Sequence, residues 1–188
     1  MDLNKKVSLK NRILFTGIVT LLVWVNIIWD YLHKGVPSHY FLQREDLPEI
    51  SNWWGAIAVP LITWFLLIQV KKRVNNNKIL DTNKLNNTIY GFLGALLFGI
   101  IFSFLFTIGS NIPGYMMIGV ILLSFFIPLY KAEFLLGFVI GMTYTFGGVL
   151  PVLIGIILTI MFTIAYKILR TSILYLVSKI GSTKKQAK

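Results

Sequence analysis

The chain has 188 residues, of which 56% are hydrophobic and only 13% charged, and it carries a formal net charge of +11 and no cysteine. A soluble domain of this length cannot bury so many apolar side chains, so the composition excludes a soluble globular protein and predicts a membrane protein. The absence of cysteine excludes disulfides, thiolate metal sites and cysteine nucleophiles. The basic residues punctuate apolar segments and do not gather on one folded surface, which argues against nucleic acid as a partner.

Apolar runs recur along the whole chain, and each is about long enough to cross a bilayer as a helix. They predict an all-α fold, a polytopic integral membrane bundle of about six transmembrane helices with no separate soluble domain. The transmembrane domain covers residues 13–168, between a basic arm of residues 1–12 and an amphipathic basic tail of residues 169–188. The expected crossings are residues 13–29, 53–70, 88–108, 115–130, 134–147 and 149–168.

The first expected crossing ends near Trp29, and no small-x-small cleavage site follows, so a retained helix is expected and not a signal peptide. If this helix continues for one more turn, Asn26, Asp30 and His33 lie at positions i, i+4 and i+7 and share one face. A carboxylate beside an imidazole orients the ring and raises its basicity, so Asp30 and His33 could move a proton together.

The connection between the first two crossings and its approach hold both histidines and most of the acidic residues of the chain. These residues are Asp30, His33, His39, Glu45, Asp46 and Glu49, with Asn26 and Asn52 at the two ends. One interpretation is an acidic mouth that favours cations or polar neutral solutes. The structural alternative makes Asp46 the N-cap of the second helix, with Pro48 in its first turn and Glu49 at the capping-box position.

No motif in the chain specifies a metal or cofactor. Two histidines six residues apart in sequence match none of the spacings that define a metal site, and HExxH, P-loop and GxGxxG motifs are missing from the sequence. No cofactor is therefore expected, and metal binding stays undetermined. The expected crossings also contain no Asp, Glu, Lys, Arg or His, which argues against a proton-driven pump.

The segment from Phe134 to Tyr166 is too long for one ordinary crossing, and the sequence FGGVLP at residues 146–151 predicts a break within it. The expectation is a fifth helix that ends near Phe146 and a sixth that begins near Val149; one kinked helix and a re-entrant hairpin stay open as alternatives. A broken helix frees backbone groups that can bind a solute, and Thr143, Tyr144 and Thr145 directly precede this break.

Small residues predict where helices approach closely. The GxxxG pattern of Gly137 and Gly141, and the similar spacing of Gly91 and Gly94, are typical of tightly packed membrane helices. Glu133 is expected at the start of the fifth helix, where its charge suits the helix dipole.

Charge predicts the orientation. All basic residues except Lys34 and Arg44 fall on one side of the bilayer if the chain crosses about six times with both termini in the cytoplasm. The expected location is the plasma (inner) membrane. The tail of residues 169–188 is expected to lie on anionic lipid of the inner leaflet, and a homo-oligomer or a larger membrane complex stays open.

Three functions are compatible with this pattern. The first is a channel or carrier for a small solute or cation, with Asn26, Asp30, Glu45, Asp46, Glu49, Asn52, Thr143, Tyr144 and Thr145 as its binding residues. The second is an enzyme that acts on a lipid or lipid-linked substrate at the outer leaflet, with His33 or His39 as general base and Asp30 as the orienting acid. The third is an accessory membrane subunit.

Overall fold

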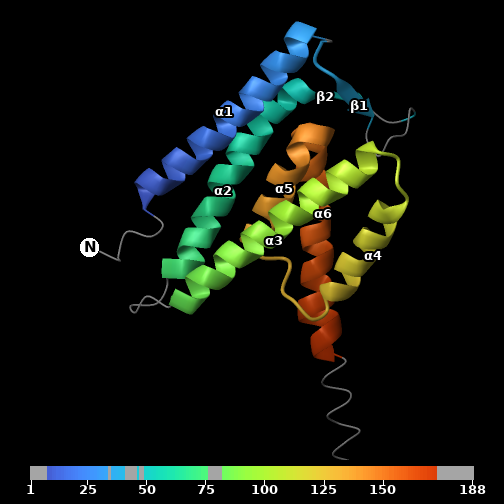
Figure 1. Ribbon diagram of the computed structural model, residues 1–188. Coiled ribbons are helices and arrows are strands. Elements are labelled where there is room, and N and C mark those ends of the chain that lie inside the picture. Colours follow the sequence, from blue (N-terminus) through green and yellow to red (C-terminus); the bar gives the residue numbers. More distant parts are fainter. Residues whose placement is uncertain (1–7, 34, 41–45, 47–48, 76–81, 173–188) are drawn as a thin grey trace, which may run out of the picture.

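A computed structural model describes residues 8–33, 35–40, 46, 49–75 and 82–172, with the side chains of residues 39, 40 and 75 excepted. The described residues form an all-α fold with one short β-hairpin (Figure 1). The helices are α1 (Leu9–His33), α2 (Gly55–Asn75), α3 (Thr82–Thr107), α4 (Ile112–Leu123), α5 (Ala132–Phe146) and α6 (Val149–Thr163). A 3-10 turn, η3 (Asn52–Trp54), precedes α2, and a π-helical turn, η4 (Ile164–Leu169), continues α6.

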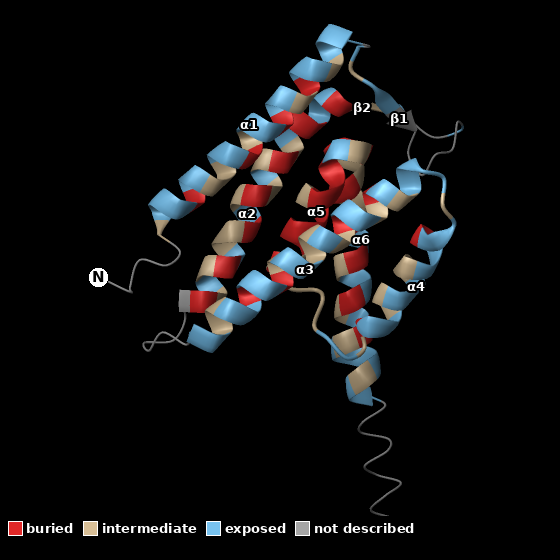
Figure 2. Ribbon diagram, viewed as in Figure 1, coloured by how far each residue is buried: buried red, intermediate tan, exposed pale blue. Residues whose placement is uncertain are grey.

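Four helical segments of the described chain are long and apolar enough to cross a membrane: Leu9–His33, Asn52–Val74, Thr82–Thr107 and Val149–Ser172. Helices α4 and α5 are apolar but shorter, with 12 and 15 residues. At about 1.5 Å per residue they reach roughly 18 and 22 Å, less than the ~30 Å of a hydrocarbon core. Many large apolar residues are exposed, as expected for helices in contact with lipid. Figure 2 shows exposed positions along the outward faces of the helices.

Helix α5 lies at the centre of the bundle, in contact with α2, α3 and α6 (Figure 1). It carries the densest run of buried residues, from Glu133 to Thr143, which Figure 2 shows in red between α2, α3 and α6. The break predicted from FGGVLP is present, because α5 ends at Phe146 and α6 begins at Val149. Gly155 of α6 packs against Leu135 and Phe138, so α5 and α6 form an antiparallel hairpin.

The α3–α5 interface is built on glycine, as the GxxxG pattern predicts. A Cβ added at Gly137 would lie 2.8 Å from the Leu96 backbone nitrogen, and one at Gly141 would lie 3.1 Å from the Cα of Gly99. Only glycine permits such an approach of two helix backbones, which maximises their van der Waals contact. Gly94 differs from the prediction: a Cβ there would meet nothing within 4 Å, because Gly94 faces a cavity and not a neighbouring helix.

An ion pair joins three helices at the end of the bundle where α2 finishes. Arg73 Nη2 lies 2.6 Å from Glu133 Oε2 and donates a hydrogen bond of 3.0 Å to Thr88 Oγ1. The Glu133 side chain is 4% exposed and that of Arg73 is 28% exposed. Helix dipole compensation was the expected role of Glu133, but its buried carboxylate has this second and stronger partner.

The connection between α1 and α2 folds as a β-hairpin, in which β1 (Ser38–Tyr40) pairs antiparallel with β2 (Glu49–Ser51). The expectation of Asp46 as N-cap and Glu49 as its capping-box partner is therefore wrong. Glu49 faces Tyr40 in the hairpin, and Ser51 caps the helix instead, because its hydroxyl accepts a hydrogen bond from the Trp53 backbone N–H at 3.4 Å. The strand pairing between distant residues overrides the local capping pattern.

Candidate solute site

A cavity of about 460 Å³ lies between α1, α2 and α5. Its lining is mostly apolar and comes from Val19, Leu22, Val23, Val25, Asn26 and Trp29 of α1, Val59 of α2, and Ile140, Thr143 and Tyr144 of α5. The fold thus brings Asn26 together with Thr143 and Tyr144, residues that are more than a hundred positions apart in the sequence. A mostly apolar cavity with a few polar groups is the usual form of a small-molecule site.

The polar groups of the cavity are few and uncharged. The Thr143 hydroxyl donates a hydrogen bond of 2.6 Å to the Val139 carbonyl oxygen, so it offers a ligand its lone pairs. Tyr144 is 82% exposed, and its hydroxyl can donate and accept. The Asn26 carboxamide adds a donor and an acceptor from the opposite helix. None of the lining residues, all within the described part of the chain, carries a formal charge.

The helix break lies directly after these residues and is held by the start of α2. Gly147 has φ 70°, a conformation that side chains other than glycine rarely adopt, and a Cβ there would overlap the Asn52 carboxamide. A Cβ at Gly55 would lie 2.8 Å from the Gly148 nitrogen, so the two backbones touch. Asn52 is 7% exposed, so the break faces a buried amide side chain.

His33 lies at the last position of α1, exposed. Its Nδ1 is 2.9 Å from the Trp29 carbonyl oxygen, and its ring stacks on the Trp29 indole at a centroid distance of 4.0 Å. A carbonyl oxygen can only accept, so Nδ1 carries the proton and Nε2 is left as the basic nitrogen. Asp30 is half-buried on the same helix and shares no hydrogen bond with His33 in the described structure.

The other residues expected at the site lie elsewhere. Asp46 and Glu49 are exposed in the hairpin, away from the residues that line the cavity. Thr145 is half-buried and lies outside the cavity lining. Glu45 and the side chain of His39 lie outside what the structure describes. Among the described residues no group of three His, Cys, Asp or Glu could hold a metal ion.

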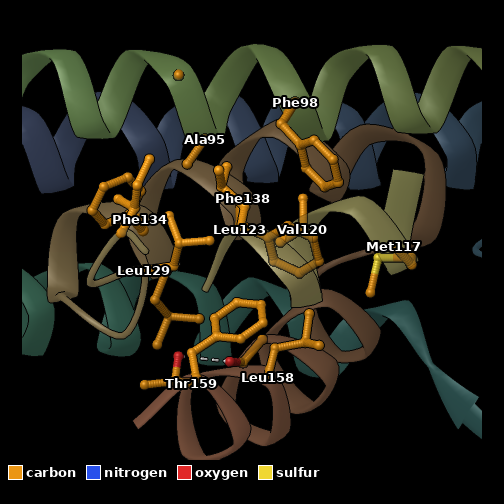
Figure 3. A pocket seen from close by; sticks show the side chains of 15 residues that line it. Ala95, Phe98, Met117, Val120, Leu123, Leu129, Phe134, Phe138, Leu158 and Thr159 are labelled. Carbon is orange, nitrogen blue, oxygen red and sulfur yellow. Dashed lines mark hydrogen bonds between the residues drawn. The ribbon is translucent and has the colours of Figure 1, made fainter. Parts of the chain in front are cut away.

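A second cavity, of about 360 Å³, lies between α3, α4, α5 and α6 and is lined almost wholly by apolar side chains (Figure 3). Sequence patterns contain no signal for it, because four helices and the residues between α4 and α5 each contribute a part of the wall. Trp29 of the first cavity was also missed, since it was used only to mark the end of the first expected crossing. Its spacing from Asn26, at i+3, is the signal that places both on one face.

Comparison of the chain with protein-family models, with curated proteins and with solved structures finds no match.

Proposed function

We propose that the chain is a carrier or channel of the plasma membrane that takes a small uncharged solute into the cavity between α1, α2 and α5. In this proposal all of α1 to α6 cross the bilayer and both termini are cytoplasmic. The distribution of Lys and Arg supports this orientation. The alternating directions of the helices agree with it (Figure 1), as do the short connections between the helices that follow α2. If α4 and α5 enter the membrane as a short pair without spanning it, α6 still begins outside and the termini stay on one side.

The observation that carries the proposal is the convergence of Asn26, Thr143 and Tyr144 on one cavity beside a broken helix. Carriers commonly bind their solutes where a discontinuous helix exposes backbone groups in the membrane. Asp30 stands one helical turn beyond Asn26 toward the hairpin, so the expected acidic mouth would lie above the cavity. The exposed Asp46 and Glu49 would extend this mouth.

The lining indicates the class of solute. A cation would need carboxylates or several carbonyl oxygens in place of its water shell, and the cavity wall offers no carboxylate. The Asn26 amide and the Tyr144 hydroxyl suit a neutral molecule with a few hydrogen-bonding groups. Valine and isoleucine side chains suit its carbon skeleton. We therefore propose that the solute is a small neutral molecule, such as a short polyol or a small amide.

The break also offers a means of moving between two states. Gly147 and Gly148 separate α5 from α6, and a change of their backbone angles would tilt α5 against α2. Asn52 is buried beside this hinge, and its carboxamide can bond the freed backbone in a second arrangement. Such rocking would open the cavity alternately to the two sides of the membrane.

Flux measured in proteoliposomes tests the proposal. The swelling of the proteoliposomes is followed after addition of glycerol, erythritol, urea or acetamide. Potassium flux is measured as the comparison for a charged solute. Each lost hydrogen bond is worth about 1 kcal/mol, so Asn26→Leu and Tyr144→Phe should each reduce solute affinity about fivefold. Thr145→Val is the matched control, since Thr145 neighbours Tyr144 but does not line the cavity, and it should keep wild-type flux.

The proposal is contradicted if the folded protein passes none of these solutes, or if Asn26→Leu leaves the flux unchanged.

The second candidate function is a lipid-modifying enzyme. One observation favours it: the Nδ1 contact of His33 with Trp29 leaves the basic Nε2 free. Mass spectrometry of lipids from cells with wild-type protein and with His33→Ala would separate the two. A lipid species that depends on His33 supports the enzyme, and an unchanged lipid profile supports the carrier.

A further inference from the structure

We propose a second binding site, for one anionic phospholipid, in the cavity between α3, α4, α5 and α6. The site is separate from the solute cavity, and its chemistry does not depend on the transport proposal. It combines two independent features: an apolar cavity that fits an acyl chain, and a group of basic residues at one end of that cavity that no carboxylate of the described residues pairs with.

The apolar half of the site is the cavity of about 360 Å³, which falls within the range of ligand pockets. Figure 3 shows Phe98, Phe138 and Leu158 around the open space, with Met117 and Val120 of α4 completing the wall. Thr159 is the one polar side chain in the lining, and its hydroxyl already donates to the Gly155 carbonyl oxygen at 2.8 Å. A ligand inside therefore meets hydrocarbon on every side, which excludes polar solutes and favours an alkyl chain.

The polar half of the site lies where the apolar cavity wall ends. Leu129 lines the cavity and Tyr130 is the next residue; Phe162 lines it and Tyr166 stands one helical turn further on. The two tyrosine rings meet at a centroid distance of 5.8 Å. The alkyl chain would thus run toward a pair of aromatic side chains, which are common at the level of lipid headgroups.

Two basic residues lie against this tyrosine pair, and a third follows Tyr130 in the sequence. Lys167 Nζ lies 5.0 Å from the centre of the Tyr130 ring, and Arg170 Cζ lies 4.7 Å from that of Tyr166. Lys131 follows Tyr130 as the N-cap of α5. None of the three is paired with a carboxylate in the described structure, because the nearby Glu133 is paired with Arg73.

Basic residues without a carboxylate partner in the described part of the chain, next to an apolar cavity, complement a molecule with an alkyl chain and a negative headgroup. A membrane phospholipid with a phosphate of net negative charge is that molecule. The proposed orientation places this end of the bundle at the inner leaflet, where anionic lipids are abundant. The π-helical turn η4 carries Lys167 here, and such turns are frequent at functional sites.

Native mass spectrometry of the full chain, purified and delipidated, tests the site. Phosphatidylglycerol and phosphatidylcholine with identical acyl chains are the probes, and inorganic phosphate tests whether the headgroup alone suffices. Wild type should bind one phosphatidylglycerol more tightly than phosphatidylcholine and should not bind phosphate. The double variant Lys167→Gln, Arg170→Gln should lose about fivefold in phosphatidylglycerol affinity per charge removed, and so lose the preference between the two lipids.

Gly94→Phe tests the cavity, since Gly94 lines it with open space at its Cβ position. Gly119→Phe on α4 is the matched control, because Gly119 also has open space but does not line the cavity. The lipid should be lost from the first variant and kept by the second. Equal affinity of wild type for both lipids, or undiminished phosphatidylglycerol binding by Gly94→Phe, would overturn the site.

If a variant fails to fold, a second measurement on the wild-type protein tests the site. Phosphatidylglycerol that carries a photoreactive diazirine in one acyl chain is crosslinked to the protein, and the modified peptides are identified. Crosslinks to α3, α4 and α6 residues of the cavity wall support the site. Crosslinks confined to the outward faces of the helices show that lipid does not enter it, and overturn the proposal.

Discussion

Replacing Arg73 by methionine should destabilise the fold strongly, because it leaves the Glu133 carboxylate buried without its cation. Glu133 is 3% exposed, and its Oε2 lies 2.6 Å from Arg73 Nη2. Methionine keeps most of the length and the apolar stem of arginine but removes the charge. Lys71 and Lys72 stay in place in the last turns of α2, so the basic character of this end of the chain is largely preserved.

The magnitude follows from the burial of the two partners. Removing one member of a fully buried ion pair costs about 3–5 kcal/mol. Arg73 is 28% exposed, so part of its charge is already solvated, and we expect roughly 2–3 kcal/mol. This corresponds to about a 30- to 140-fold change in the ratio of folded to unfolded protein.

Unfolding by sodium dodecyl sulfate in mixed micelles, followed by tryptophan fluorescence, measures the change. The double variant Arg73→Met, Glu133→Leu should recover most of the lost stability, because no charge is then left buried. The Thr88 hydroxyl remains satisfied in both variants, since it donates to the Lys84 carbonyl oxygen at 2.9 Å. Wild-type stability of Arg73→Met, or a double variant no more stable than the single one, would refute the reasoning.

Two glycine substitutions test the packing that surrounds the proposed site. Gly147→Ala places a Cβ on a residue with positive φ and against the Asn52 carboxamide, so we expect the free energy of unfolding to fall by at least about 1–2 kcal/mol. Adding Asn52→Ala should restore part of this loss. Wild-type stability of Gly147→Ala would show that Asn52 does not restrict the break. Gly141→Leu should separate α3 from α5 and cost about 3 kcal/mol or prevent folding, whereas Gly114→Leu, which meets nothing within 4 Å, should be neutral or slightly stabilising. Equal unfolding midpoints for these last two variants would contradict the glycine interface.

The features that sequence reasoning predicted correctly are the ones that short stretches of chain determine. Two glycines followed by a proline break a helix through their own backbone preferences, so the ends of α5 and α6 could be read from FGGVLP. The glycine spacing of residues 137 and 141 likewise predicts a close helix contact without naming the partner.

The features that sequence reasoning missed depend on distant residues. The convergence of Asn26 and Tyr144 on one cavity is a product of α1 and α5 packing, which no local pattern encodes. Glu133 had a sufficient local explanation in the helix dipole, so nothing in the sequence directed attention to Arg73. Asp46 fits a capping box locally, but pairing of β1 with β2 moved the helix start to Ser51.

Accessibility of single cysteines tests the solute cavity most directly, and the native chain contains no cysteine that would interfere. Asn26→Cys and Tyr144→Cys are treated in intact cells with a maleimide that cannot cross membranes. Ser38→Cys, exposed in the hairpin, is the outer reference, and Thr82→Cys, exposed at the start of α3, is the inner one. Maleimides react in water and not in lipid, so labelling reports a water-filled cavity.

We predict that both cavity cysteines react from the outside, as Ser38→Cys does, and that a transported solute slows their labelling. Thr82→Cys should react only after the membrane is permeabilised. Cavity cysteines that stay unlabelled while Ser38→Cys reacts would mean that Asn26 and Tyr144 face lipid. That result would contradict a solute site between α1, α2 and α5.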